Sequence, residues 1–181
     1  MKIKFLLSIN DKKILVDCGL FQGVKNLREK NWQEFPVDIT SIDVLLLTHA
    51  HIDHSGYIPA LTKAGFKGKV YSSSATFDLC KVLLPDSGYL QEEDARYANY
   101  KKFSKHNPAL PLYTEADARQ SLAAFNPISM NQVIEIETGI TATFTPVGHI
   151  LGACAIKISA KGKSITFSGD VGRQDDLVMY P

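Results

Sequence analysis

The sequence has few cysteines, no long apolar run and no CxxC pair. The three cysteines, Cys18, Cys80 and Cys154, are widely spaced, so neither a disulfide framework nor a thiolate zinc site is indicated. Each is expected to be a small buried residue in a reducing compartment. No apolar run approaches the roughly 18 residues of a membrane-spanning helix, and the one near the N-terminus is too short for a signal peptide. We therefore expect a cytoplasmic protein with no membrane partner.

Positive and negative charges are nearly balanced in the sequence. Lysine and arginine number 20 against 19 aspartate and glutamate, a formal net charge of +1, which gives no electrostatic argument for nucleic acid or an acidic partner. The 181 residues, 45% hydrophobic and 22% charged, suit one globular domain with a real core. Histidine is the informative residue, because three of only five histidines fall within six residues.

The chain is predicted to run from strands through a helical block and back to strands. Short apolar or alternating runs predict strands at 4–9, 12–17, 43–48, 69–72, 132–137, 141–146, 153–160 and 164–168. Helices are expected at 26–35, at 55–64 and, in pieces, within 74–125. This order predicts an α+β domain whose sheets are covered by helices.

The helical block carries two kinds of boundary signal. Interruptions are expected at Pro85, Gly88, Pro108 and Pro111. A helix is expected to start after Thr114, because a threonine followed three residues later by an acidic side chain, here Asp117, is typical of a capped N-terminus.

The strongest functional signal is an HxHxDH motif formed by His49, His51, Asp53 and His54 at the end of a predicted buried strand. Imidazole nitrogen and carboxylate oxygen both bind Zn²⁺. Residues two apart on an extended turn can share one ion, which groups His49 with His51 and leaves Asp53 and His54 for a second. A solvated polar loop is the weaker interpretation, because these groups would repel when protonated and would be costly when buried without metal.

Later residues complete the predicted site. His149 lies in a glycine-flanked turn between two predicted strands, and Asp170 directly follows a strand. We assign His49, His51 and His149 to the first metal, Asp53 and His54 to the second, and Asp170 to both. Two ions about 3.5–4 Å apart activate a shared water and clamp the attacking and leaving oxygens, which predicts metal-assisted hydrolysis. Asp17, at a strand end, is expected to orient a ligand histidine. The predicted catalytic set is therefore Asp53, His54, Asp170 and Asp17.

The order of these residues along the chain resembles the metallo-β-lactamase superfamily. The segments at 17–23, 54–59, 148–152 and 168–173 are similar to its β-CASP branch of RNA-processing nucleases. This resemblance implies an αββα four-layer fold, a binuclear zinc site and hydrolysis of RNA phosphodiester bonds, with RNA as the partner. It leaves open the cleavage mode, its direction, the RNA target and homo-oligomer formation.

Two departures from the family pattern carry expectations of their own. Members usually begin with a strand and a glycine-rich turn before the segment matching 6–8. They also continue past the residue matching Asp170 into a β-CASP domain and then complete the first domain, adding a last histidine ligand. Residues 1–181 are therefore expected to be the N-terminal part of the metallo-β-lactamase domain. The second zinc would be under-coordinated, and the isolated chain is expected to show little nuclease activity.

Two alternatives and a set of RNA contacts remain open. One alternative is another hydrolase of the superfamily, such as a thioesterase or a glyoxalase II-like enzyme. The other is a non-catalytic scaffold that has lost its metals, against which the intact ligand set argues. The candidate RNA contacts are Arg173, close to Asp170, and Lys101, Lys102 and Lys105 in the helical block. For the lysines, a solvated surface is the competing interpretation.

Overall fold

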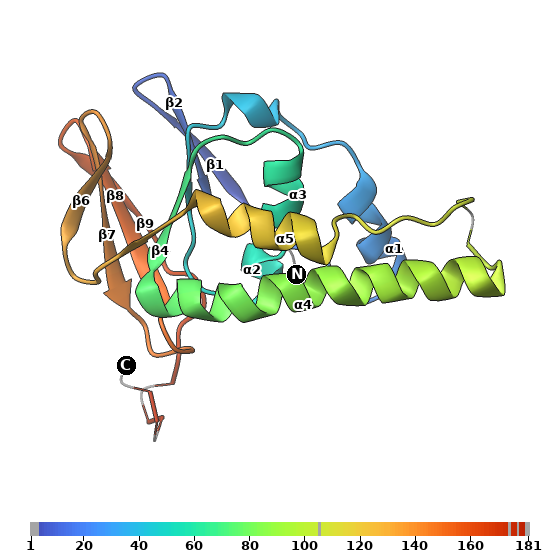
Figure 1. The fold of residues 1–181 in the computed structure, drawn as a ribbon. Coiled ribbons are helices and arrows are strands. Elements are labelled where there is room, and N and C mark those ends of the chain that lie inside the picture. Colours follow the sequence, from blue (N-terminus) through green and yellow to red (C-terminus); the bar gives the residue numbers. More distant parts are fainter. Residues whose placement is uncertain (1–3, 105, 174, 177, 180–181) are drawn as a thin grey trace.

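Two β-sheets stack against each other, and helices cover the outer face of the first (Figure 1). The computed structural model describes residues 4–104, 106–173, 175–176 and 178–179. In the first sheet, β1 (Phe5–Ile9) pairs antiparallel with β2 (Lys12–Val16). The order continues through parallel β3 (Val44–Leu46), β4 (Lys69–Ser73) and β5 (Phe125–Ile128). The second sheet is antiparallel, with β6 (Val133–Glu137), β7 (Ile140–Pro146), β8 (Cys154–Ala160) and β9 (Lys163–Phe167) in order.

The helices are mostly short, apart from one that runs the length of the helical layer (Figure 1). The α-helices are α1 (Lys25–Arg28), α2 (Ile52–Ser55), α3 (Ile58–Lys63), α4 (Ser74–Lys101) and α5 (Glu115–Ser121). The 3₁₀ turns are η1 (Glu29–Trp32), η2 (Ile39–Ser41) and η3 (Leu122–Ala124). Over the residues that the structure describes, none of these helices is long and apolar enough to cross a membrane.

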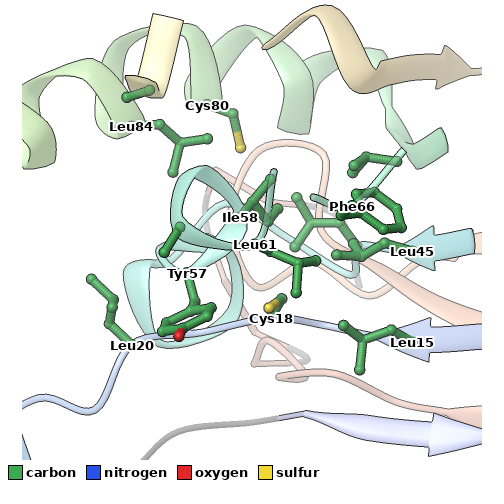
Figure 2. Close-up of a cluster of buried hydrophobic side chains, with 14 of the residues drawn as sticks. Leu15, Cys18, Leu20, Leu45, Tyr57, Ile58, Leu61, Phe66, Cys80 and Leu84 are labelled. Carbon is green, nitrogen blue, oxygen red and sulfur yellow. The ribbon is translucent and has the colours of Figure 1, made fainter. Parts of the chain in front are cut away.

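The central strands are buried on both faces, which explains their continuous apolar sequence. In β3, Leu45 packs into the core under the helices, whereas Val44 and Leu46 pack into the core between the sheets. Figure 2 shows the first of these cores, where Leu45 lies near Leu61 of α3. The described residues therefore supply three layers, helix, sheet and sheet, of the predicted four-layer fold.

The structure joins β1 and β2 in a hairpin and confirms that the cysteines are buried. Asn10 and Asp11 both adopt positive φ between β1 and β2, as a tight hairpin turn requires. All three cysteines are free and buried. The second sheet follows the predicted strands to within a residue or two at each end.

The predicted breaks at Pro85 and Gly88 are wrong, because α4 continues through both residues. Pro85 is buried, so packing outweighs the backbone hydrogen bond that a proline removes. Gly88 marks a close contact, since a Cβ there would lie 2.7 Å from backbone atoms of Thr114 and Glu115. The missing side chain allows the start of α5 to pack directly on α4.

Three other elements differ from the prediction. The helix expected at 26–35 is shorter, with α1 and η1 ending at Trp32. The helix expected at 55–64 is two helices, α2 and α3, that join at Gly56 and Tyr57. Strand β5 was not predicted, because Pro127 masks its strand pattern. A proline is tolerated there because β5 is an edge strand that pairs only with β4.

The predicted helix cap at Thr114 is confirmed and allows a test of stability. Thr114 Oγ1 accepts from the Asp117 amide at 3.1 Å, and Asp117 Oδ2 accepts from the Thr114 amide at 2.9 Å and from Lys63 Nζ at 2.7 Å. The Lys63 hydrogen bond, followed by the backbone one, lowers the pKa of Asp117. A carboxyl whose pKa is lowered on folding stabilises the protein above its unfolded pKa, and loses that effect as the pH falls through its folded pKa.

Asp117→Ala is therefore expected to lower the free energy of unfolding by about 1 kcal/mol at pH 7. The difference in the free energy of unfolding between this variant and the unsubstituted chain should shrink as the pH falls below the ordinary range of carboxyl pKa values. Urea unfolding over a pH series measures both. The control replaces the exposed Asp78, which is paired with Lys81 at the surface, with alanine. A loss that is the same at every pH would contradict the cap.

Candidate metal centre

The candidate metal-ligand side chains gather at the edge where β2, β3, β7 and β9 all end. His49 follows β3 by three residues, and His51 is the N-cap of α2. His149 lies in the turn between β7 and β8, and Asp170 follows β9. Backbone hydrogen bonds hold these segments together, from Cys154 N to Thr48 O at 3.0 Å and from Gly172 N to Val147 O at 2.9 Å.

Four potential ligand atoms lie within 4.8 Å of one another, on His49, His51, His149 and Asp170. His51 Nδ1 lies 3.1 Å from His49 Nε2 and 3.2 Å from His149 Nε2. Asp170 Oδ2 lies 3.6 Å from His149 Nε2 and 3.8 Å from His49 Nε2. Donors held at zinc bond lengths around a tetrahedral ion are about 3.3–3.6 Å apart. The three nitrogens and one oxygen therefore fit a single divalent cation.

A second position lies on the other side of Asp170. Its Oδ1 is 3.5 Å from His54 Nε2, and that buried nitrogen has no hydrogen-bond partner within the described ranges. Asp53 is half-buried, and its charge favours protonation of both His51 and His54. Asp170 thus turns one oxygen toward the first cluster and the other toward His54, as a bridging carboxylate would. The division of ligands between two ions stays a prediction.

The electrostatics of the cluster favour neutral imidazoles on the first position. Burial, together with the charges of His54, His51 and His149, lowers the pKa of His49 to about 3. Burial and His149 also lower the pKa of His51. A neutral imidazole keeps the lone pair that a cation needs. His54 differs: burial opposes its protonation, but the hydrogen bond and charge of Asp17, aided by Asp170, outweigh burial and raise its pKa.

Asp17 lies beneath the cluster rather than in its open side. It is buried, adopts a positive φ of 57° directly after β2, and accepts a hydrogen bond from His54 Nδ1 at 2.8 Å. The predicted role of Asp17 in orienting a ligand histidine stays a prediction. Thr48, which the sequence reasoning did not single out, also contacts Asp17. Its only sequence signal is its position directly before the motif.

The candidate RNA contacts lie at two distances from the cluster. Arg173 is exposed and follows Gly172, whose amide is bonded to the His149 turn. Lys101 and Lys102 are exposed at the C-terminal end of α4. The N-terminal end of α4 is at the cluster, because Thr76 Oγ1 donates to Gly152 O in the His149 turn at 2.9 Å. A 28-residue helix is about 42 Å long, so these lysines lie far from the metal cluster. Lys105 lies outside the described residues.

Comparisons with known proteins identify the family of the chain. The sequence profile of the metallo-beta-lactamase superfamily matches residues 5–181. The chain belongs to this superfamily. Two solved structures share its fold at low sequence identity. A metallo-β-lactamase with an HARLDQ motif from Cronobacter sakazakii has a TM-score of 0.58 and 20% identity, over 98% of this chain and 58% of that one. The metallo-beta-lactamase fold protein YhfI from Bacillus subtilis has a TM-score of 0.54 and 18% identity, over 96% and 56%.

Several curated relatives of the chain carry names of RNA nucleases or RNA-processing factors. Ribonuclease TTHA0252 from Thermus thermophilus is 29% identical over 97% of this chain and 36% of its own length. Cleavage and polyadenylation specificity factor subunit 3-I from Arabidopsis thaliana is 33% identical over 94% and 22%. Endoribonuclease ysh1 from Aspergillus fumigatus is 31% identical over 97% and 19%. The chain thus spans between 19% and 36% of the length of these relatives. Their names confirm the resemblance to the β-CASP branch.

Proposed function

We propose that this chain provides the metal centre of a zinc-dependent phosphodiesterase that cleaves RNA. The observation that carries the proposal is the position of Asp170, with one oxygen toward the histidine cluster and the other toward His54. Divalent cations held by such a donor set activate water for attack and neutralise charge on a phosphate. The ribonuclease names of two relatives support RNA as the substrate.

The burial of the ligands supports one direction of substrate approach. His49 and His54 are fully buried and form the floor of the cluster. His149 and Asp170 are partly exposed, with side chains 27% and 41% accessible. A phosphodiester therefore reaches the cluster from the side of His149 and Asp170. His49, His51 and His149 would hold the first cation, and Asp53 and His54 the second, with Asp170 between them.

The proposed RNA contact of Arg173, close to the metal cluster, can be tested by substitution. Arg173→Ala is expected to weaken binding of a short oligoribonucleotide and to reduce its salt slope by about one unit, because one phosphate contact is lost. Lys101→Ala should weaken binding only of RNA long enough to reach the far end of α4. Fluorescence anisotropy across a salt series measures both. Arg119, whose guanidinium is paired with Glu115 on α5, provides the control variant Arg119→Ala. If Arg173→Ala leaves the RNA affinity and its salt slope unchanged, Arg173 does not contact a phosphate of the RNA.

A direct activity test separates the proposal from its alternatives. The chain, loaded with Zn²⁺ and in excess over substrate, is incubated with a labelled oligoribonucleotide and, separately, with a small thioester. Slow, chelator-sensitive RNA cleavage that is lost in His49→Ala is the expected result. Turnover of the thioester without RNA cleavage would favour the thioesterase or glyoxalase II-like alternative. Absence of bound metal by elemental analysis would favour a scaffold.

A further inference from the structure

The hydroxyl of Thr48 lies at the centre of the polar network beneath the metal cluster. Thr48 is 1% exposed and directly precedes His49. Its Oγ1 lies 3.0 Å from His49 Nδ1, and 2.9 Å and 3.0 Å from the two carboxylate oxygens of Asp17. It also lies 3.4 Å from His54 Nδ1. One side chain is therefore within hydrogen-bond distance of both buried histidines and of the carboxylate below them.

The hydrogen-bonding capacity of these groups determines which atom donates each hydrogen bond and which atom accepts it. His49 Nε2 faces the ligand atoms of His51 and Asp170, and His54 Nε2 faces Asp170. When the Nε2 atoms serve as ligands, each Nδ1 carries the hydrogen and must donate it. His54 donates directly to Asp17 at 2.8 Å. His49 donates to Thr48 Oγ1, which in turn donates to Asp17.

The backbone of Thr48 is held as tightly as its side chain. Its amide donates to Asp17 Oδ1 at 2.8 Å, and its carbonyl accepts from Cys154 N at 3.0 Å. A Cβ on Gly169 would lie 2.9 Å from Thr48 Cβ, so the residue before Asp170 packs directly against this side chain. These contacts fix the position of the Thr48 hydroxyl between His49 and Asp17.

We propose that Thr48 is a positioning residue that couples the two metal positions, by linking His49 to the same carboxylate that orients His54. The proposal rests on the proposed metal centre. Partners that hold the second ring nitrogen fix the orientation of a ligand histidine, and their loss weakens metal binding. Here one carboxylate serves both positions, directly for His54 and through a hydroxyl for His49. Thr48 and Asp17 are each 1% exposed, so both would act through the histidines and not on the substrate.

Two substitutions separate this role from simple packing. Valine keeps the shape of threonine and removes the hydroxyl, whereas serine keeps the hydroxyl and removes the methyl group. A positioning role predicts that Thr48→Ser resembles the parent chain and that Thr48→Val is impaired. A packing role predicts the reverse order. Thr62 in α3, whose hydroxyl bonds Pro59 O away from the cluster, supplies the control Thr62→Val.

The experiment is metal titration of the full chain. Zn²⁺ affinity is measured by competition with a chromophoric chelator, the ligand field by the visible spectrum of bound Co²⁺, and folding by circular dichroism. Thr48→Val is expected to bind Zn²⁺ about 10–100-fold more weakly with an altered Co²⁺ spectrum. Thr48→Ser and Thr62→Val should keep the parent affinity and spectrum.

The outcomes distinguish this proposal from the one it rests on. Parent-like affinity and spectrum in Thr48→Val, or equal impairment in a folded Thr48→Ser, would overturn the positioning role. If Thr48→Val does not fold, Thr48→Ser decides alone: the parent spectrum supports the role and an altered one overturns it. Failure of the unsubstituted chain to bind metal would overturn the metal centre itself.

Discussion

Replacing His149 with alanine is expected to weaken Zn²⁺ binding at the first position by about 100-fold and to abolish the proposed RNA cleavage. His149 Nε2 lies 3.2 Å from His51 Nδ1 and 3.6 Å from Asp170 Oδ2, so it would supply one of the four donors of the proposed site. Four-ligand zinc sites bind with about 10–16 kcal/mol. One donor then accounts for about 3 kcal/mol, which is roughly 100-fold in affinity.

The matched control for this prediction is His106→Ala. His106 is exposed in the loop after α4 and is not part of the ligand cluster. Chelator competition and urea unfolding of both variants separate lost ligation from lost stability, since the His149 side chain is partly exposed. Equal Zn²⁺ affinity in His149→Ala and His106→Ala would show that His149 is not a ligand.

The largest structural effect is expected from Gly19→Ala. A Cβ at Gly19 would lie 1.5 Å from the carbonyl oxygen of Asp53 and 2.7 Å from the amide nitrogen of His54. The backbone on either side of Gly19 cannot move away from this segment, because Cys18 N donates to His54 O and Leu20 N donates to Ile52 O. The variant must therefore displace the segment that carries Asp53 and His54. We expect it to lose more than about 4 kcal/mol of stability.

Urea unfolding and metal titration test this effect against Gly162→Ala. Gly162, in the turn between β8 and β9, has a positive φ, but a Cβ at this position would meet no described atom within 4 Å. The control should cost about 1 kcal/mol of backbone strain and leave Zn²⁺ binding unchanged. A Gly19→Ala variant as stable as Gly162→Ala would show that the two segments are not in contact.

Much of the fold follows from local sequence patterns. The apolar run in β3 is buried on both faces, as its short length and its polar flanking residues indicate. Asn10 and Asp11 adopt the positive φ values of a tight hairpin, and Thr114 with Asp117 forms the predicted cap. Each of these signals lies within a few residues along the chain.

The elements that were predicted wrongly depend on contacts between distant residues. Helix α4 continues through Pro85 because both Pro85 and Gly88 are buried, and Gly88 packs on the start of α5. Strand β5 forms by pairing with β4, which lies far earlier in the chain, on the other side of the whole helical block. No local pattern reports either contact, so the sequence alone favoured breaks and loops there.

The candidate site shows the same division. A short motif in the sequence identifies His49, His51 and His54. The structure places His149, which is 98 residues from His51 in the sequence, in contact with this motif. Thr48 carries no such signal, because a buried threonine is common and its function depends on which groups face its hydroxyl. Only the fold places Asp17 beside it, 31 residues away.

Anomalous diffraction at the zinc edge, from crystals of the chain grown with Zn²⁺, tests the central claim most directly. A strong peak is expected among His49, His51, His149 and Asp170, and a weaker one between Asp170 and His54. A zinc peak elsewhere, with none among these four side chains, would contradict it.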